Sequence, residues 1–429
     1  MFQAHSTTLD LLLEPGDYRP WGVLRFDNQP GHEDDRPRTM RYYNPQDHAV
    51  HPVKRRNAAR VDSLQFAKEG TRNWFVQGLT IRNPSANPGV NEHASNLTVD
   101  FCLIEDFGEY GFRMRNTDNC TVQRCVIRDS RQFEVGESTG VQVRGNRADH
   151  ILGIQILDNE IYNVGDGIQI TANDPDPWIP IEVLIEGNDV YLERSRYICD
   201  TNTSLDENAI DIKAGSDTPA STVIRNNRMW GMRRNAEPAS AFGELLVLQQ
   251  YSRKVVIEGN IMGDAPRGMK DEGWPDEAGI PADSARDILI RDNEFYAIRD
   301  YAAADEGAVT KPITGGFEFL DNHVARSSFL ADVGPLAYGQ PDPKYLGNVL
   351  ADVDGVQRQP DPAPPSPGPA ALPFDPALNP SVPPIFGYET YERRRWTGRE
   401  FALGAIPRPI PWWYRLRHPR DTVLGSSGP

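Results

Sequence analysis

Ile257-Glu-Gly-Asn260 and Ile290-Arg-Asp-Asn293 are two copies of a phrase that recurs along the chain. In each copy an apolar, strand-forming stretch ends at one fixed position, mostly in an amide or a thiol residue. Consecutive copies lie 23 to 39 residues apart, so the shortest unit has 23 residues and the others carry insertions. The nine copies are Val76-Gln-Gly-Leu79, Val99-Asp-Phe-Cys102, Val122-Gln-Arg-Cys125, Ile156-Leu-Asp-Asn159, Ile185-Glu-Gly-Asn188, Ile224-Arg-Asn-Asn227, Ile257-Glu-Gly-Asn260, Ile290-Arg-Asp-Asn293 and Phe319-Leu-Asp-Asn322.

This repeat predicts a stack of coils. Repeated units that cannot bury their apolar faces alone gain a continuous core by stacking. A unit of about 23 residues with two or three short strands and no helical pattern suits one turn of a right-handed parallel β-helix. Asparagines at one bend can also hydrogen-bond from coil to coil. The alternative is a β-sandwich of many short strands, but such strands have no reason to share an asparagine at one phase.

Composition limits the partners. The chain has 429 residues and a formal net charge of −16, which argues against nucleic acid because phosphate binding needs a basic face. A site for an acidic glycan must therefore be locally basic. The sequence has no apolar run long enough to span a membrane, and MFQAHSTTLD at the start lacks the pattern of a signal peptide. We expect the chain as given to begin after a lost leader, and its oligomeric state cannot be read from the sequence.

The cysteines give a local prediction. Cys102 and Cys125 occupy the repeated position in successive coils, where parallel side chains point the same way. Because that geometry is poor for a disulfide, we predict stacked, buried thiols. Cys120 and Cys199 have no obvious partner, so the cysteines do not reveal the redox compartment.

The chain divides into four predicted segments within one elongated solenoid. Residues 1–72 are less regular and should form an N-terminal cap with the first coils. Residues 73–358 carry the repeats, and residues 359–385 are dense in Pro and Ala, as expected of an extended tether. Residues 386–429 are short, aromatic and basic; we predict a strap along the acidic body, with binding of an anionic polymer as the alternative.

One strand in each of four coils carries a polar row. In Gly111-Phe-Arg-Met-Arg115 alternation directs Phe112 and Met114 inward and both arginines outward. The matching strands are Gly140-Val-Gln-Val-Arg144, Gly167-Ile-Gln-Ile-Thr171 and Ala209-Ile-Asp-Ile-Lys213, and long insertions lie beside them. A plainer interpretation is that such charges only keep the sheet soluble. The predicted substrate-binding residues are Arg113, Arg115, Gln142, Gln169, Thr171 and Asp211.

The sharpest local signal is Asp206-Glu-Asn-Ala-Ile-Asp-Ile-Lys213. Asp206, Glu207 and Asn208 offer the hard oxygen ligands that Ca²⁺ prefers, so we predict a calcium site. Lys213 follows on the same strand as Asp211. A bound cation lowers the pKa of a neighbouring lysine by like-charge repulsion, which would make the amine a better base near neutral pH.

At these residues the chain resembles the family 6 polysaccharide lyases, which include alginate lyases and chondroitinase B and share the pectate-lyase-like parallel β-helix. The resemblance aligns Asp206 with the first acidic calcium ligand, Asn208 with the second and Lys213 with the catalytic base. It implies β-elimination: a cation and an arginine neutralise a uronate carboxylate, the lysine removes the C5 proton, and the 4-O-glycosidic bond breaks. An acidic polysaccharide substrate in turn implies an extracellular or periplasmic location.

The sequence departs from this family in two places. Asn208 stands where the family has an acid, and Gly243-Glu-Leu-Leu-Val-Leu248 lacks the family's arginine. Arg144 and Arg234 are the predicted substitutes, so the expected catalytic set is Lys213, Arg144 and Arg234.

Other functions suit the same fold. A glycoside hydrolase would need a carboxylate pair such as Asp166 and Asp211, although Asp166 lies between glycines and could be a turn residue. A uronate epimerase would need a second acid or base, for which His93 and His150 are the nearest histidines. A glycan-binding or structural β-helix would use Asp211 and Lys213 only as an ion pair.

Overall fold

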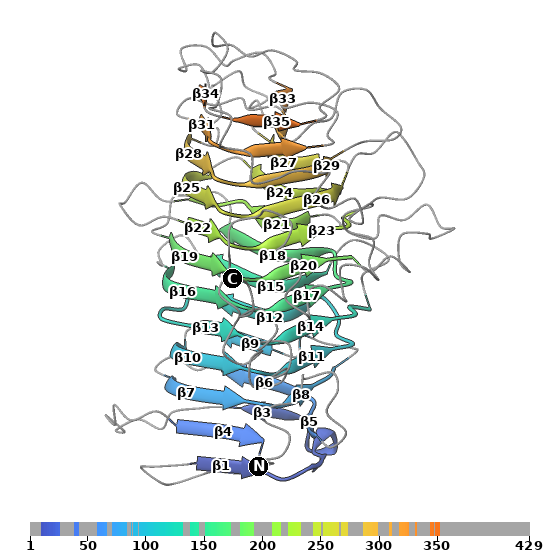
Figure 1. Cartoon of the computed structure of the whole chain (residues 1–429). Coiled ribbons are helices and arrows are strands. Elements are labelled where there is room, and N and C mark those ends of the chain that lie inside the picture. Colours follow the sequence, from blue (N-terminus) through green and yellow to red (C-terminus); the bar gives the residue numbers. More distant parts are fainter. Residues whose placement is uncertain are drawn as a thin grey trace, which may run out of the picture. The chain divides into compact units, whose positions relative to one another are not determined.

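A computed structural model shows the protein as an all-β chain of short strands (Figure 1). The structure describes residues 10–25, 38–42, 58–66, 71–83, 87, 89–92, 94–131, 138–145, 151–172, 181–192, 208–215, 222–232, 243–249, 252–265, 267–272, 286–298, 309–310, 317–325, 331–332, 344–346 and 348–351. Its secondary structure there is strand apart from one short 3-10 helix, η1 (Arg19–Trp21). No helix within these ranges has the length and hydropathy needed to cross a membrane.

The chain forms two compact units. The first comprises Met1–Asp189 and Lys213–Thr222, and the second comprises Val190–Ile212 and Val223–Pro429. In each unit every coil contributes one strand to each of three parallel sheets, which we call the first, second and third sheets in the order in which the chain reaches them.

The first unit contains the coils nearest the N-terminus, drawn in blue to green in Figure 1. Its first sheet contains β1 (Asp10–Leu13), β4 (Arg38–Tyr42), β7 (Arg72–Gln77), β10 (Ser95–Asp100), β13 (Thr121–Gln123), β16 (Ile151–Leu157) and β19 (Ile181–Glu186). The second sheet contains β2 (Gly16–Asp17), β5 (Ala59–Val61), β8 (Thr80–Ile81), β11 (Leu103–Glu105), β14 (Val126–Arg128) and β17 (Glu160–Tyr162). The third sheet contains β3 (Val23–Arg25), β6 (Ser63–Phe66), β9 (Gly89–Glu92), β12 (Tyr110–Arg115), β15 (Thr139–Gly145) and β18 (Asp166–Ala172).

The second unit repeats this arrangement. Its first sheet contains β22 (Thr222–Arg225), β25 (Arg253–Glu258), β28 (Arg286–Arg291), β31 (Phe317–Leu320) and β34 (Lys344–Leu346). The second sheet contains β20 (Asp189–Tyr191), β23 (Arg228–Trp230), β26 (Ile261–Ala265), β29 (Glu294–Ile298), β32 (His323–Ala325) and β35 (Val349–Ala351). The third sheet contains β21 (Asn208–Ile212), β24 (Glu244–Gln249), β27 (Arg267–Glu272), β30 (Val309–Thr310) and β33 (Ala331–Asp332).

The repeated asparagines form hydrogen-bonded ladders inside each unit, as the sequence predicted. In the second unit each asparagine Nδ2 donates to the Oδ1 of the next, at 3.0 Å from Asn227 to Asn260 and 2.9 Å from Asn260 to Asn293. The ladder continues through Asn322 to Asn348. In the first unit Asn159 donates to Asn188 in the same way at 2.9 Å.

At the ladder positions from Asn159 to Asn322 the residue before the asparagine has a left-handed backbone, which turns the chain from the first sheet into the second. Gly187 and Gly259 have φ of 75° and 62°, and Asp158, Asn226 and Asp292 fill the same place with φ of 53° to 56°. Gly, Asn and Asp tolerate this conformation best. In the recurring Gly-Asn and Asp-Asn pairs the first residue therefore adopts the left-handed conformation of the bend, and the asparagine forms the ladder.

Thiols occupy the same position in two coils of the first unit. The Cys102 backbone N–H donates to Cys125 Sγ at 3.4 Å, and the Cys125 N–H donates to Asn159 Oδ1 at 2.9 Å. Cys102 and Cys125 are free and buried, which confirms the predicted stack of thiols. Cys120 is also buried, and Cys199 lies outside the described residues. Burial raises the pKa of Cys125 well above its usual value, and Cys102 adds to the shift.

The core consists of the inward-facing side chains of the three sheets. Val76, Val99, Val122 and Ile156 stack in register in the first unit with no exposed surface. In the second unit the Tyr191 and Trp230 rings stack 4.2 Å apart between neighbouring strands of the second sheet. Aliphatic ladders of this kind hold successive coils together.

The structure thus shows the predicted parallel β-helix, with three strands in each coil. The predicted tether (359–385) and strap (386–429) lie outside the described residues. The predicted cap boundary at residue 72 stays a prediction, although strands already stack from β1 onward.

Candidate functional site

The third sheet of the first unit carries the predicted polar row. Its strands are parallel and in register, so that Arg113, Gln142 and Gln169 form one outward column. A second outward column contains Arg115, Arg144 and Thr171. The side chains between these positions, Phe112, Met114, Val141, Val143, Ile168 and Ile170, have no exposed surface. Coils in such a sheet are about 4.8 Å apart, so each column presents one side chain per coil.

Lys213 joins this face. Its backbone N–H donates to the carbonyl oxygen of Ile170 at 2.7 Å, as the next strand of a parallel sheet would. This bond sets Lys213 beside Thr171 and therefore in line with Arg144 and Arg115. Arg113, Arg115, Arg144, Gln169, Thr171 and Lys213 are half-buried.

A glycine near the start of β12 and of β15 changes which side chains lie on the outer face of the third sheet. An added Cβ at Gly111 would lie 2.6 Å from the Gly140 carbonyl oxygen, and one at Gly140 would lie 2.6 Å from the Gly167 carbonyl oxygen. The register skips these glycines, so that Tyr110 aligns with Thr139 and Thr139 with Asp166.

Simple alternation would therefore have placed Tyr110 and Asp166 on the inner side. Instead Asp166 Oδ2 accepts a hydrogen bond from the outward-facing Gln169, and Tyr110 lies under the Arg113 guanidinium. Asp166 belongs to β18, so the interpretation of it as a turn residue was wrong. The glycine before each alternating stretch was the signal that could have revealed this column, because it breaks the period of two.

These outward residues form a hydrogen-bonded network across three coils. Gln142 Nε2 donates to Gln169 Oε1 at 2.7 Å, and Gln169 Nε2 donates to Asp166 Oδ2 at 2.8 Å. Gln142 and Asp166 are each 3 % exposed. Burial, followed by the hydrogen bond with Glu109, raises the pKa of Tyr110, while a hydrogen bond with Gln142 acts in the opposite direction.

Cations are concentrated on this face. Arg113 pairs with Glu92 at 2.7 Å, and the Arg115 guanidinium lies 3.8 Å from the same carboxylate. The Arg113 guanidinium carbon is 5.2 Å from the centre of the Tyr110 ring, a cation–π contact. Two arginines thus share one carboxylate at the start of a row that continues through Arg144 to Lys213.

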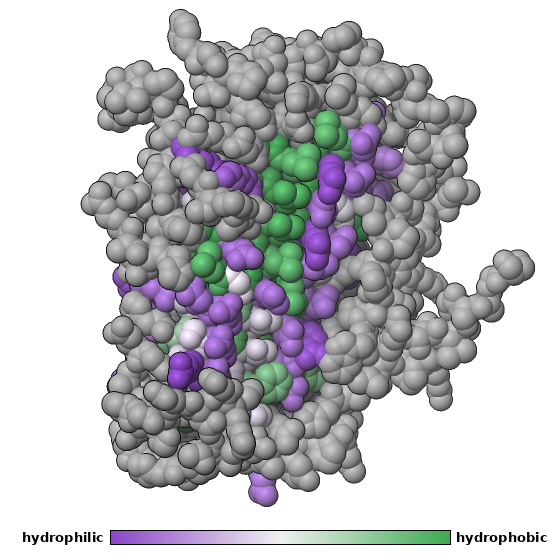
Figure 2. All heavy atoms as spheres, turned by 90° about the vertical axis from the view of Figure 1, so that its left-hand side faces the viewer, coloured by the Kyte–Doolittle hydropathy of each residue, from purple (hydrophilic) through white to green (hydrophobic). Residues whose placement is uncertain are grey.

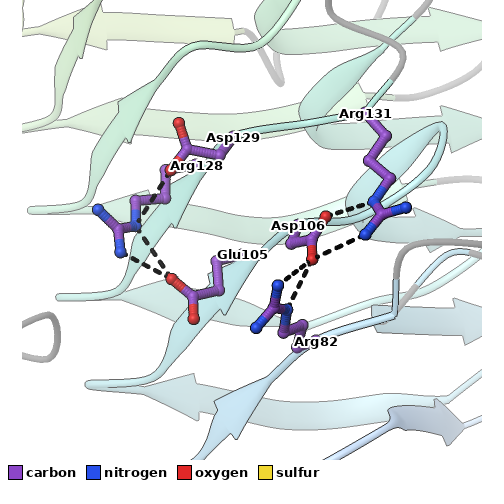
Figure 3. Close-up of polar contacts among 6 residues, drawn as sticks. All are labelled: Arg82, Glu105, Asp106, Arg128, Asp129 and Arg131. Carbon is purple, nitrogen blue, oxygen red and sulfur yellow. Dashed lines mark hydrogen bonds and ion pairs between the residues drawn. The ribbon is translucent and has the colours of Figure 1, made fainter.

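The turn after the second sheet shows a different use of arginine (Figure 3). Asp106 is bound by Arg131 at 2.5 Å and by Arg82 at 2.5 Å, and these two cations hold its pKa below the usual range. Arg128 pairs with Glu105 at 2.7 Å and with Asp129 at 3.5 Å. This turn contains three arginines and three carboxylates. Its charges balance locally, so it fastens coils together rather than attracting an anion.

The outer face of the first sheet is partly apolar, unlike that of the third sheet. Figure 2, which looks at the side where the first-sheet strands lie in Figure 1, shows apolar side chains gathered in a band with polar side chains beside it. In the second unit the neighbours Val256 and Leu289 are half-buried outward residues of this sheet. The cationic row therefore belongs to the third sheet and is not a general property of the surface.

Part of the predicted site belongs to the second unit. Asn208 and Asp211 lie on β21, in register with Glu244 and Val247, and are 5 % and 0 % exposed. Glu244 Oε1 accepts a hydrogen bond from Arg267 at 2.6 Å and lies 3.5 Å from Lys270 Nζ.

The described residues do not supply a calcium shell. Two cations already neutralise Glu244, the carboxylate that lies in register with Asn208. The described ranges hold no group of three or more His, Cys, Asp or Glu placed to bind a metal ion. Asp206 and Glu207, the acidic ligands of the predicted calcium site, lie outside those ranges, as do Arg234, His93 and His150. Calcium stays a prediction, and no chemical step below depends on it.

Comparisons with known proteins agree with the fold. A family model described as "Right handed beta helix region" matches residues 66–236. No curated protein matches the chain significantly.

Three solved structures illustrate the structural likeness. The A-module of mannuronan C-5 epimerase AlgE6 from Azotobacter vinelandii is 14 % identical with a TM-score of 0.47, over 79 % of this chain and 90 % of that one. An alginate lyase from Paenibacillus sp. is 15 % identical with a TM-score of 0.33, over 81 % and 91 %. PfbA, a surface adhesin of Streptococcus pneumoniae, is 10 % identical with a TM-score of 0.41, over 81 % and 84 %. Since a fold does not determine an activity, function must be argued from the site itself. The parallel three-sheet coils give this chain the parallel β-helix fold, and the right-handed β-helix family model matches residues 66–236 of it.

Proposed function

We propose that the third sheet of the first unit binds an acidic, uronate-containing polysaccharide and cleaves it by β-elimination, with Lys213 as the base. The observation that carries this proposal is the hydrogen bond from the Lys213 N–H to Ile170, which aligns the lysine with Arg144 and Arg115. A row of cations at the spacing of the coils suits a polymer with regularly repeated carboxylates. The net charge of −16 makes such a row unexpected unless it serves an anionic ligand.

The proposed reaction has a defined balance of bonds. Arg144 pairs with the uronate carboxylate and stabilises the charge that develops when the C5–H bond breaks. The neutral amine of Lys213 takes that proton, the C5–H electron pair forms the C4–C5 double bond, and the glycosidic oxygen on C4 leaves with its bonding pair. That oxygen then receives a proton from solvent.

Substitution of Lys213 tests the proposal. Lys213→Arg keeps the positive charge but removes the proton acceptor, because a guanidinium stays protonated in proteins. We expect alginate, polygalacturonate or a glycosaminoglycan to give the ultraviolet absorbance of unsaturated uronates with the wild type. The Lys213→Arg variant should release product at least about 100-fold more slowly, the typical size of general base catalysis, while binding the same polymer.

Arg291→Gln is the matched control, since Arg291 is exposed in the second unit and pairs only with Glu258 among the described residues. It should change neither binding nor cleavage. Unchanged product formation by Lys213→Arg would refute Lys213 as the base. Binding without product in the wild type would indicate a glycan-binding protein, and exchange of the C5 hydrogen without chain cleavage would indicate an epimerase.

A further inference from the structure

The side-chain hydrogen bonds on the proposed binding face run in one direction. Gln169 turns its NH2 group toward Asp166 and donates to Oδ2, and a carboxyl oxygen that carries no proton can only accept. The carbonyl oxygen of Gln169 then faces Gln142, which must answer with its own NH2 group, as observed at 2.7 Å. Asp166 therefore determines the orientation of two amides in succession.

The second hydrogen of the Gln142 amide is also used. The hydrogen bond between Gln142 and Tyr110 acts to lower the pKa of Tyr110, although burial raises that pKa overall. Because Gln142 Oε1 has no hydrogen-bond partner among the described residues, this bond must use Nε2, which can only donate. Both donors of Gln142 thus point to protein acceptors, one on Tyr110 and one on Gln169.

The third polar position of the Gln142 amide, its carbonyl oxygen, forms no hydrogen bond with the described residues. This oxygen, Oε1, is buried. In its column Gln142 lies between Arg113 on one coil and Gln169 on the next, and both of these are half-buried. A sugar that lies across Arg113 and Gln169 would pass over the Gln142 amide. Because Oε1 has almost no exposed surface, a hydroxyl group reaches it only where these two side chains move apart.

We propose that Gln142 Oε1 accepts a hydrogen bond from a hydroxyl group of the bound sugar, and that Asp166 is the positioning residue that keeps this acceptor turned toward the ligand. This inference rests on the proposed function and deepens it. The arginines recognise the carboxylates of the polymer, whereas Gln142 selects a sugar with a hydroxyl group at one position. A site built around a buried acceptor discriminates strongly against a ligand that cannot donate to it.

Asp166→Asn separates this role from a merely structural one. The asparagine has the same shape, but its NH2 group can donate to Gln169 Oε1, so that Gln169 donates to Gln142 Oε1 in turn. The reversed chain turns the Gln142 carbonyl toward Gln169 and leaves its NH2 group in the buried place that the carbonyl held. We expect the variant to be no more stable than the wild type, and to bind the polymer about tenfold more weakly because the face then offers a donor in place of the acceptor Oε1.

The experiment uses the full chain and a panel of alginate, polygalacturonate and hyaluronan. Affinities of the wild type, Asp166→Asn and Gln142→Met are measured by calorimetry at one ionic strength, with thermal unfolding in parallel. Selective ¹⁵N labelling of glutamine reports the side-chain amides of Gln142 and Gln169. Asp321→Asn is the control, because Asp321 is exposed and has φ of 51°, which asparagine tolerates.

The expected result is weaker binding by both Asp166→Asn and Gln142→Met, with both amide signals shifted in Asp166→Asn and no change in the control. Wild-type binding that both variants retain in full would overturn the role of Gln142 while leaving the proposed function intact. Amide signals that do not move in Asp166→Asn would overturn the positioning role of Asp166. A wild type that binds none of the three polymers would count against the proposed function and this inference together, and the amide signals would still show whether the relay exists.

Discussion

At the scale of single residues, Glu294 in the second unit shows how burial controls ionisation. It lies on β29, is 6 % exposed, and its Oε2 has no hydrogen-bond partner among the described residues. Its neighbours in register are Ile261 and His323. Burial raises the pKa of Glu294 to about 8, so the carboxyl is protonated at neutral pH. Burial also lowers the pKa of His323, against the opposing charge of Asp292.

We predict that Glu294 makes the protein less stable in mild alkali. An acid whose pKa is higher in the folded state than in the unfolded state contributes stability below its unfolded pKa, and this stability is lost as the pH rises through the folded pKa. The shift from 4.5 to about 8 corresponds to at most about 5 kcal/mol. Denaturant unfolding at pH 6 and pH 9 measures the prediction. The free energy of unfolding should fall less between these two pH values for Glu294→Gln than for the wild type. The exposed variant Glu182→Gln should follow the wild type; equal pH dependence in all three proteins would contradict the prediction.

At the scale of structural elements, the asparagine ladder connects bends that are far apart in sequence. Asn260 donates from Nδ2 to Asn293 Oδ1 and to the Ile224 carbonyl oxygen, each at 2.9 Å. Its Oδ1 accepts from the backbone N–H and from Nδ2 of Asn227, each at 3.0 Å. One buried side chain therefore satisfies polar groups of the coil before it and of the coil after it, and the bend depends on it.

We expect Asn260→Ala to lower the free energy of unfolding by about 3 kcal/mol or more, because several buried polar groups lose their partners together. Asn348→Ala is the comparison. Asn348 is the last rung of the described ladder, where it accepts from Asn322 and donates to the Phe319 carbonyl oxygen. Its substitution should cost less, since fewer coils depend on it. Denaturant titration measures both losses, and equal losses would show that the ladder does not act as a continuous element.

At the scale of the whole molecule, an acidic chain presents a locally basic row. The net charge is −16, and in the described turn around Asp106 the arginines are balanced by carboxylates. The third sheet of the first unit aligns Arg115 and Arg144 in register, with Lys213 joined to the same sheet and Glu92 beside Arg115. Attraction of a polyanion must then act at short range, against the repulsion of the rest of the surface.

We predict that polymer binding weakens steeply with salt and that Arg144 carries part of this dependence. Salt screens exposed charges over about 10 Å at 0.1 M and about 3 Å at 1 M, so the short row should lose most of its attraction at high salt. Arg144→Gln should weaken binding at low salt and flatten the salt dependence. The exposed Arg291→Gln should leave both unchanged. Binding measured from about 0.05 to 0.5 M salt tests this, and a salt dependence that Arg144→Gln does not alter would exclude the row as the binding face.

Much of the fold could be predicted from the sequence because its signals are local. The spacing of Asn260, Asn293 and Asn322 and the alternation in Gly111-Phe-Arg-Met-Arg115 each depend only on neighbouring residues, and the structure confirms the coils, the ladder and the register. The outward residues of the candidate site were predictable only where inward and outward side chains alternate strictly along the strand. The predicted calcium ligands Asp206 and Glu207 lie in an insertion, for which the repeat gives no conformation, and they are outside the described residues.

The sequence by itself thus determined the parallel coils and the outward row that includes Arg113, Gln142 and Arg144, since a period of two and a repeated bend are written into adjacent residues. Only the tertiary structure brought Tyr110 and Asp166 to the same face. The close approach of successive coils at Gly111 and Gly140 interrupts the alternation there, and which side chains then meet depends on distances between coils rather than on neighbours in the chain.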